Sequence, residues 1–384
     1  MRRTSLLMPE IRARILSAAA DISTADWNAC AGADNPFVSH EFFHALEASG
    51  SACARTGWQP AHIVVDDAAG TPIGILPAYL KSHSQGEYVF DHGWAEAWER
   101  AGGEYYPKLQ CAVPFTPATG PRLLLRDPAA APALLAAAQA LAVQNKLSSV
   151  HATFITPEQQ PAFEAQGWLM RIGEQFHWSN DGYATFADFL AALSSRKRKA
   201  IRKEREGALA SGVEIVHITG AELTEAHWDA FWEFYQDTGM RKWGRPYLTR
   251  AFFSLLGETM PDRVLLMLAL RDGRPVAGAL NLIGGDCLYG RYWGSTEDIP
   301  FLHFELCYYQ AIDWAIAHGL ARVEAGAQGS HKLARGYRPV ATVSAHFIPN
   351  SSFRSAVADF VAREGEMVEA DIEALDMATP FRKG

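Results

Sequence analysis

Two stretches of the chain carry the same order of apolar and polar positions. The segments SHEFFHALEASG at 39–50 and LTRAFFSLLGET at 248–259 share a Phe-Phe-x-x-Leu pattern, in which apolar residues recur on one face of a helix. Each segment has a Ser or Thr near its start, which favours a helix N-terminus. Both are therefore predicted to be amphipathic helices, with matched apolar positions at Phe42, Phe43 and Leu46 and at Phe252, Phe253 and Leu256.

The same order of strands follows each helix. Residues 61–90 and 265–294 both contain an apolar strand, a turn, a second strand that opens with proline, and a third strand after a glycine-marked hairpin. In the second copy Asp272-Gly273 and Gly284-Gly285 stand between apolar runs, which is a strong signal for tight hairpins. Three consecutive strands are therefore predicted in each copy.

A long helix and several short elements complete each copy. Long helices are predicted at 132–146 and 302–318, each followed by a short strand, a short helix and a terminal pair of strands. The first copy also holds an insert at 93–120 that is rich in aromatic residues and proline. Loops of that length inside a compact domain are more often functional than not.

This order of elements resembles the GNAT acyltransferase fold. The chain has 384 residues, which exceeds the roughly 250–300 residues that one hydrophobic core supports. We predict an α/β (α+β) protein of two tandem GNAT-like halves, each a mixed, mostly antiparallel sheet flanked by helices. The predicted units are an N-terminal leader at 1–20, a first domain at 21–180 that includes the insert, and a second domain at 181–384.

Composition narrows the class of protein. No apolar run reaches the ~20 residues that cross a bilayer, and the N-terminus lacks the continuous apolar core of an export signal. Five scattered cysteines fit a reduced compartment and argue against a structural zinc site. We therefore expect a cytoplasmic protein with no metal and no membrane span, whose oligomeric state the sequence leaves open.

One short stretch is strongly basic although the formal net charge of the chain is −8. SSRKRKAIRKERE at 194–206 holds seven Lys and Arg residues and is predicted to be a helix that Ser194 or Ser195 caps. The acidic balance of the whole chain argues against DNA binding. Two alternatives stay open: a solvated helix, or one stripe with Arg198 and Arg202 that contacts phosphates of a donor or acceptor.

Longer motifs resemble one family. They are LQCAVPFTPATGPRLL, LSSRKRKAIRKERE, RKWGRPYLT, FLHFELCYYQAIDWAIAHGL and EAGAQGSHKLARGY. They resemble the FemAB-like family of bacterial predicted N-acyltransferases, which is described as a peptidoglycan biosynthesis or recognition family and is related to the FemX aminoacyltransferases. The resemblance runs from about residue 24 to 376. It implies direct transfer of an acyl or aminoacyl group to a small-molecule or peptide amine, with acyl-CoA or aminoacyl-tRNA as co-substrate and no permanently bound cofactor.

One segment departs from the GNAT pattern. In that fold the acyl-CoA pyrophosphate usually binds a glycine-containing turn at the start of the long helix. The corresponding turn here, at 295–306, contains no glycine. Three functions therefore stay open: an acyltransferase, a FemX-like transferase that uses aminoacyl-tRNA on a peptidoglycan precursor, and a non-catalytic binding protein for a cell-wall fragment or a partner.

Candidate catalytic residues lie where the third and fourth main strands of a GNAT fold separate. Glu324 is the candidate base, with a solvent-facing edge glutamate as the alternative, and His151 is its counterpart in the first copy. His331 belongs to a residue type that titrates near neutral pH. His303 opens the long helix, where an imidazole could replace the missing backbone donors. Tyr337 is a candidate acid for the leaving group, with core packing as the alternative.

Candidate binding residues surround the same strand ends, and we expect the site in the second half. Lys332 and Arg335 could clamp a phosphate or carboxylate, while Glu305 could equally be a helix-dipole partner. The RKWGRPYL segment mixes cations with aromatics, as nucleotide-binding loops do; a structural loop is the alternative. The full set is Arg241, Trp243, Arg245, Tyr247, Arg291, Tyr292, Glu305, Lys332, Arg335, Arg198 and Arg202.

Overall fold

The structure is a computed structural model that describes residues 12–243, 246–326 and 329–382, apart from the side chains of 240–243 and 330. The first half contains β1 (Arg12–Leu16), α1 (Thr24–Ala31), α2 (His40–Ala48), β2 (Trp58–Pro60), β3 (His62–Asp66), β4 (Pro72–Leu76), β5 (Tyr79–Lys81), α3 (His92–Arg100), β6 (Lys108–Cys111), β7 (Leu124–Leu125), α4 (Ala131–Gln144), β8 (Val150–Ile155), α5 (Gln160–Ala165) and β9 (Leu169–Ser179).

The second half contains α6 (Phe186–Ala192), α7 (Ser195–Leu209), β10 (Glu214–Thr219), α8 (Glu225–Trp243), α9 (Arg250–Thr259), β11 (Val264–Arg271), β12 (Arg274–Ile283), β13 (Cys287–Ser295), α10 (Leu302–Phe304), a π-helical turn (Glu305–Tyr309), α11 (Gln310–Ala317), β14 (Arg322–Glu324), a 3-10 helix (Ser330–Arg335), β15 (Arg338–Phe347) and α12 (Ser351–Met377). Residues 1–11 of the predicted leader lie outside the described residues, and the rest of it begins with β1.

The second half follows the predicted order closely. Strands β11, β12 and β13 form the expected antiparallel meander. The hairpin between β11 and β12 turns at Asp272 and Gly273, whose φ angles of 51° and 73° match a tight turn with two left-handed residues. The predicted long helix is present as α10, the π-helical turn and α11 in succession. Together these elements confirm a tandem GNAT-like chain.

The first half differs from the prediction at its third strand. Residues 86–90 were expected to form it, but they form bends, and Tyr88 has a φ of 60°, outside the strand region. Strand β6, inside the predicted insert, instead pairs with β5 and β8. The strand was predicted because the apolar Tyr-Val-Phe run resembles one. The prediction was wrong because Glu87 and Asp91, at the two ends of this run, both point inward and bind Lys108.

The last strands of the two halves are exchanged. Strand β9, from the first half, pairs with β14 of the second half, and β15, from the second half, pairs with β8 of the first. The two exchanged strands also pair with each other, from Leu169 opposite His346 to His177 opposite Arg338. The predicted terminal strand pair of each half is therefore wrong, because each half supplies one long strand whose partners belong to both halves.

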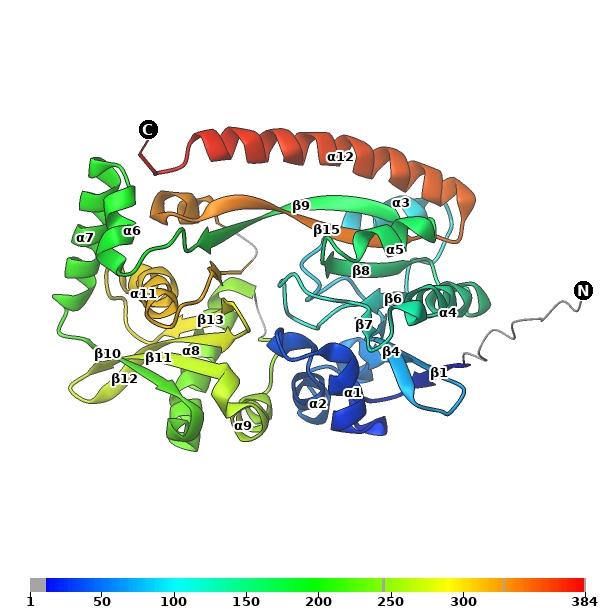
Figure 1. Cartoon of the computed structure of the whole chain (residues 1–384), viewed down its shortest axis with the longest axis horizontal. Helices are drawn as coiled ribbons and strands as arrows, with labels where there is room; N and C mark the ends of the chain where they lie inside the picture. Colours follow the sequence, from blue (N-terminus) through cyan, green and yellow to red (C-terminus); the bar gives the residue numbers. More distant parts are fainter. Residues whose placement is uncertain (1–11, 244–245, 327–328, 383–384) are drawn as a thin grey trace, which may run out of the picture.

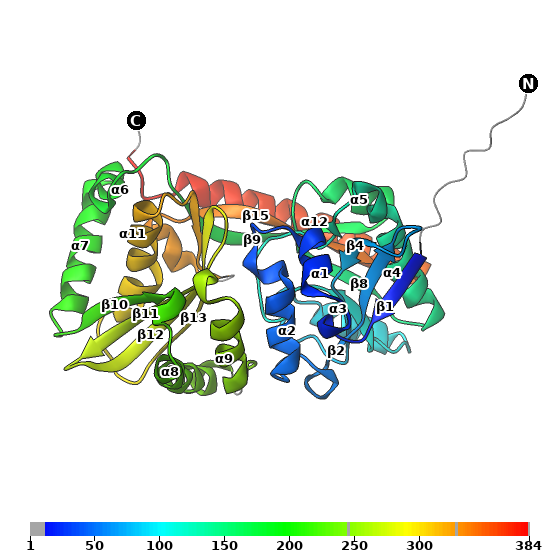
Figure 2. The same ribbon diagram turned by 60° about the horizontal axis from the view of Figure 1, so that its bottom comes forward.

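This exchange joins both halves into one 11-stranded sheet, in the order β10-β11-β12-β13-β14-β9-β15-β8-β6-β5-β2. A separate 4-stranded sheet contains β1, β3, β4 and β7. Helix α12 lies along β9 and β15 and spans both halves (Figures 1 and 2). Arg171 of β9 binds Glu364 of α12 at 2.6 Å, which fixes the helix on the exchanged strands.

A buried ion pair fixes the basic helix α7 to the long helix. Arg205 donates to Glu305, with Nη2 3.0 Å from Oε1, and its guanidinium stacks on Phe186. Glu305 is wholly buried and also accepts a hydrogen bond from Gln310. By contrast, Arg202 on the same helix is exposed and forms no ion pair with any residue that the structure describes. Arg205, which follows Arg198 and Arg202 at helical spacing on α7, therefore has a structural role.

Removal of Arg205 should destabilise the protein. Arg205→Ala leaves the buried Glu305 carboxylate without its charged partner, which costs roughly 3 kcal/mol of unfolding free energy. The matched change Arg202→Ala should alter it by less than about 0.5 kcal/mol, because it affects an exposed side chain. Urea denaturation of both variants measures the difference, and equal stability would contradict the assigned role of the pair.

A glycine permits helix α8 to lie close to β13. A Cβ at Gly294 would lie 2.0 Å from the backbone carbonyl oxygen of Phe234, whereas a Cβ at Gly290 on the same strand meets no atom closer than 3.4 Å. Gly294→Ala should therefore lower the unfolding free energy by roughly 1–3 kcal/mol or more through overpacking. Gly290→Ala is the matched control, and thermal unfolding that affects both variants equally would contradict this account.

Candidate functional site

The candidate site lies where β13 and β14 separate. The two strands pair in parallel only from Cys287–Arg322 to Tyr289–Glu324. Beyond this point β13 continues to Ser295 on β12 alone, and the register shift opposite Leu280 and Asn281 leaves Arg291 as an extra residue. Such a bulge redirects side chains and is common beside functional sites. The separation is where the sequence analysis expected chemistry.

Glu324 is a buried carboxylate at the end of β14. It is 5% exposed, so the solvent-facing alternative does not apply. Its Oε1 lies 3.4 Å from Nε of Arg322, and its Oε2 accepts no hydrogen bond from the described residues. Burial raises the pKa of Glu324 to about 7, although the nearby Arg322 acts in the opposite direction. A carboxylate with such a pKa can exchange protons near neutral pH.

A histidine that the sequence analysis missed faces this carboxylate. His177, on the exchanged strand β9, is opposite Glu324 in the ladder, with Nε2 3.8 Å from Oε2. Burial and the cations Arg322 and Lys332 lower the pKa of His177 to about 3, so its imidazole is neutral. The signal was hidden because strand exchange, not sequence proximity, places His177 beside Glu324.

Gln175 holds the histidine in place. The imidazole Nε2 lies 3.1 Å from Oε1 of Gln175, whose amide in turn donates to the carbonyl of Pro117 at 2.9 Å. Because Nε2 donates to an amide oxygen in this arrangement, the proton of the neutral ring is assigned to Nε2. A loop of the first half thus fixes the residue that faces Glu324.

Three predicted binding residues meet at Phe115, two residues before Pro117 in the same first-half loop. Arg291 and Tyr292 both donate to the carbonyl oxygen of Phe115, and Tyr247 stacks on the Phe115 ring with centroids 4.9 Å apart. The Arg291 guanidinium also lies 5.7 Å from the ring of Phe37. The structure therefore brings these residues together at the junction between the halves, on the Glu324 side of β13.

The opposite face of β13 carries a cluster of aromatic and imidazole rings. The ring of His303 lies 5.3 Å from Trp293, 5.5 Å from Tyr308 and 6.4 Å from His331, as centroid distances. Nε2 of His331 lies 2.8 Å from the hydroxyl of Tyr308. Tyr308 belongs to the π-helical turn, a feature that often marks functional sites in helices. The structure thus groups two of the predicted catalytic residues, His303 and His331.

The remaining residues of the GSHKLARGY motif have local partners. Lys332 is buried, donates to the carbonyl of Gly326 at 2.7 Å and has its pKa lowered to about 8 by burial. Arg335 binds Glu204 and stacks on Phe304. Tyr337 is wholly buried against Tyr308, and its hydroxyl has no hydrogen-bond partner among the described residues. These contacts favour packing and loop support over an open anion clamp.

The other predicted contacts lie apart from these clusters or outside the description. Arg198 is half-buried on α7 and, like Arg202, forms no ion pair with a described residue. Arg245 lies outside the described residues, and the structure describes only the helical backbone of Arg241 and Trp243. Within the described residues, no group of three or more His, Cys, Asp or Glu side chains could hold a metal ion.

In the first half, the position that corresponds to Glu324 is filled by buried side chains. His151 occupies the position that corresponds to Glu324, and its Nδ1 lies 2.6 Å from Nδ1 of His346 on the exchanged strand β15. Asp91 and Lys108, which form an ion pair, lie beside it, and all these side chains are buried. Burial lowers the pKa of His151 to about 3. The first half thus fills this position with a histidine beside an ion pair, whereas the second half places a carboxylate there. Oδ1 of Asp91, like Oε2 of Glu324, has no hydrogen-bond partner among the described residues.

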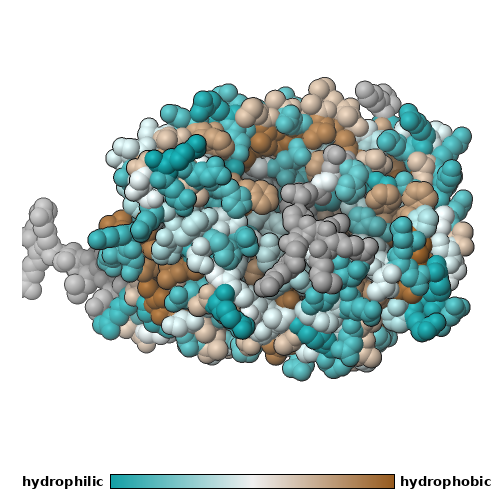
Figure 3. All heavy atoms as spheres, turned by 180° about the vertical axis from the view of Figure 1, so that it is seen from behind, coloured by the Kyte–Doolittle hydropathy of each residue, from teal (hydrophilic) through white to brown (hydrophobic). Residues whose placement is uncertain are grey.

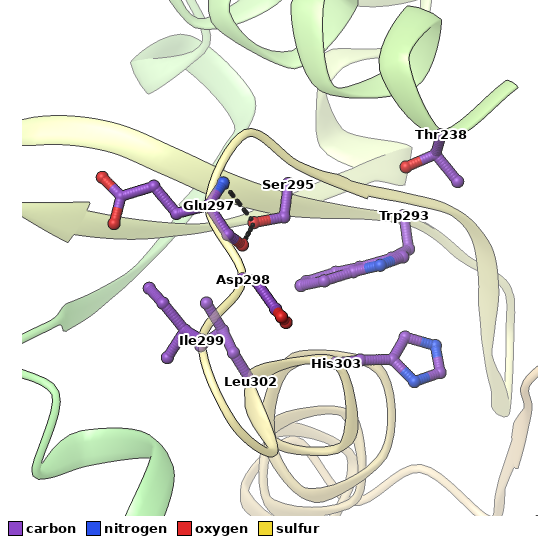
Figure 4. Close-up of a pocket in the computed structure, with 8 residues that line it drawn as sticks. All are labelled: Thr238, Trp293, Ser295, Glu297, Asp298, Ile299, Leu302 and His303. Carbon is purple, nitrogen blue, oxygen red and sulfur yellow. Dashed lines mark hydrogen bonds between the residues drawn. The ribbon is translucent and has the colours of Figure 1, made fainter. Parts of the chain in front are cut away.

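A cavity of about 260 Å³ lies beyond the end of β13, next to the start of the long helix. This is the place of the turn at 295–306 that lacks glycine. Figure 4 shows its lining, in which Trp293 and His303 form one side and Asp298 projects between them. The lining residues are Thr238, Trp293, Ser295, Glu297, Asp298, Ile299, Leu302 and His303.

The helices and the surface were also compared with those expected of a membrane-spanning protein. Among the described residues, no helix is long and apolar enough to cross a membrane. On the face shown in Figure 3, apolar residues are interrupted by hydrophilic ones.

Comparisons with solved structures show a shared fold. The crystal structure of FemX matches at 13% identity with a TM-score of 0.56, covering 88% of this chain and 98% of that chain. The structure of L-PGS from Bacillus licheniformis matches at 10% identity with a TM-score of 0.51, covering 85% and 96%. The C-terminal domain of a putative lysylphosphatidylglycerol synthetase from Agrobacterium fabrum matches at 11% identity with a TM-score of 0.51, covering 90% and 97%.

The family is shown by the sequence itself. No curated protein matches significantly. The model of the FemAB-like family, described as peptidoglycan biosynthesis/recognition, matches residues 18–383. This match agrees with the family that the sequence motifs resemble, and the solved structures share the fold of this chain. The chain belongs to the FemAB-like family of peptidoglycan biosynthesis/recognition proteins.

Proposed function

We propose that the chain transfers an aminoacyl or acyl group directly to an amine of a peptidoglycan precursor, with Glu324 as the base. The observation that carries this proposal is the buried Glu324 carboxylate, which keeps one unpartnered oxygen at the separation of β13 and β14. A buried carboxylate without a full set of partners is costly for stability, so its retention favours a chemical role. The buried histidine and ion pair that fill the corresponding position of the first half support placing the reaction in the second half.

The reaction that this geometry supports is a single direct transfer. The acceptor amine loses a proton to Glu324, and its lone pair attacks the carbonyl carbon of the donor. A C–N bond forms and the C–O or C–S bond to the leaving group breaks. Glu324 then returns the proton to the leaving oxygen or sulfur, so the carboxylate is regenerated. Neutral His177 lies beside the carboxylate and adds no charge that would hold Glu324 ionised at low pH.

The lining of the cavity favours an aminoacyl ester over acyl-CoA as donor. A CoA pyrophosphate needs several backbone or cationic donors. The lining residues that the structure describes include two carboxylates and no Lys or Arg. Aminoacyl-tRNA is thus the proposed co-substrate, and acyl-CoA is the alternative that the assay includes.

Loss of the carboxylate should abolish transfer. Glu324→Gln should lower the rate by roughly 10²–10⁴-fold, the usual contribution of a general base. Glu214→Gln, at an exposed glutamate on β10, is the matched control. The assay uses purified protein with acetyl-CoA, longer acyl-CoAs or aminoacyl-tRNA and a panel of amine-bearing peptidoglycan precursors. Full activity of the Gln variant would remove Glu324 from the mechanism, and no transfer with any donor would favour a binding protein.

The raised pKa also predicts a pH-dependent stability difference. Burial raises the Glu324 pKa from 4.5 to about 7, so the folded protein holds a proton that the unfolded chain releases between these pH values. The carboxylate therefore reduces the unfolding free energy progressively as pH rises through this window, by up to roughly 3 kcal/mol above pH 7.

Comparison of wild type with Glu324→Gln isolates this effect from other titrating groups. The variant should be similar in stability near pH 4.5 and should gain on the wild type as pH rises to 7. Urea denaturation at several pH values measures it. A difference between the two proteins that does not change with pH would show that Glu324 titrates as an ordinary glutamate.

A further inference from the structure

The cavity at the start of the long helix has the chemistry of a cation site, although its place in the fold would suggest an anion site. Its carboxylates are Glu297 and Asp298. Arg271 forms an ion pair with Glu297 and so compensates that charge. Asp298 is exposed and forms no ion pair with any residue that the structure describes. Among the described lining residues, one negative charge is therefore left without a compensating cation.

An aromatic wall lies beside this carboxylate. In Figure 4 the Asp298 carboxylate lies beside the edge of the Trp293 indole and points toward the space between Trp293 and His303. The turn is held in place by Ser295, whose hydroxyl donates to the carbonyl of Glu297 at 2.6 Å and accepts from its amide at 3.2 Å. An indole face together with a carboxylate is the combination that recognises an alkylammonium group.

The size of the cavity limits the ligand to a small group. At about 260 Å³ it lies below the roughly 300–1,000 Å³ of pockets for drug-sized ligands. A space of this size admits the amine end of an amino acid. Trp293 packs with the core on the helix side of β13, where the ring of His303 contacts it. Tyr289, the ladder partner of Glu324, packs on the opposite side. The cavity and the base therefore approach the strand separation from opposite faces.

We propose that this cavity binds the ammonium group of an amino-acid-like ligand, held between the Asp298 carboxylate and the Trp293 indole. This inference rests on the proposed transferase function, because it assigns one face of the strand separation to an amine-bearing substrate. The ammonium comes either from the α-amine of the aminoacyl donor or from an alkylamine of the acceptor other than the one that Glu324 deprotonates. Both have the same chemistry at this cavity.

The test uses the full chain labelled with 5-fluorotryptophan, with the Trp293 resonance assigned through Trp293→Phe. Two cationic probes are titrated, L-alanine methyl ester for a donor and Nα-acetyl-L-lysine amide for an acceptor. N-acetyl-L-alanine methyl ester is the neutral control, and inorganic pyrophosphate is the anionic one. At least one cationic probe should shift the Trp293 resonance saturably, and the probe that does so identifies the source of the amine.

The variants separate charge recognition from non-specific binding. Asp298→Asn should weaken the binding of the cationic probe by about five- to tenfold, as expected for a partly exposed charge-assisted contact. Asp272→Asn, at the hairpin between β11 and β12, is a matched control that should leave binding unchanged. Equal shifts by the neutral probe, a saturable shift by pyrophosphate, or no loss in Asp298→Asn would each overturn the inference.

Failure of the proposed function is distinguishable from failure of this inference. Glu324→Gln leaves the cavity lining intact and should bind the cationic probe as the wild type does. If Glu324→Gln retains full transfer activity while the probe still binds, the assigned base is wrong and the ammonium site stands. If Glu324→Gln loses transfer and no cationic probe shifts Trp293, the base stands and the ammonium site is overturned.

Discussion

The exchange of the last strands is the constraint on which the rest of the structure depends. Because β9 and β15 pair with each other and each continues into the sheet of the opposite half, the two halves form one sheet. Backbone groups of both strands would lose their partners if the halves separated, and unsatisfied backbone groups are costly. Helix α12 then covers the exchanged pair, held by the contact between Arg171 and Glu364. The halves are thus coupled by main-chain pairing as well as by side-chain packing.

The two copies are chemically unequal although the exchange treats them alike. Each strand at the GNAT separation faces a histidine of an exchanged strand: Glu324 faces His177, and His151 faces His346. In the first half, the stretch between β5 and β6 brings Asp91 beside this position, and Lys108 neutralises it. In the second half the buried carboxylate of Glu324 takes this position, and its Oε2 accepts no hydrogen bond from the described residues. The two halves therefore place different titratable groups at the same position of the fold, with burial raising the pKa of Glu324 to about 7 and lowering the pKa of His151 to about 3.

How much the sequence predicts depends on the range of the interaction. The meander of the second half was predictable because Asp272-Gly273 and the apolar alternation act locally. The third strand of the first half was not predictable. Tyr88 and its neighbours have strand-like composition, but the backbone here turns so that Glu87 and Asp91 can bind the buried Lys108. His177 was missed because its role arises only from pairing across the halves. Glu324 was found because a lone carboxylate among small apolar residues is a local signal.

The candidate site residues are divided between the two faces of β13. Glu324, Arg291 and Tyr292 lie on the side where the first half contributes Phe115, while Trp293 and His303 lie on the helix side. A donor and an acceptor that approached from the same face would compete for one space. Because β13 and β14 separate after Tyr289 and Glu324, groups from opposite faces can meet at that point without displacing either strand. In the proposed reaction, the opening in the sheet then positions the substrates more than any single side chain does, and the buried carboxylate beside it is the proposed base.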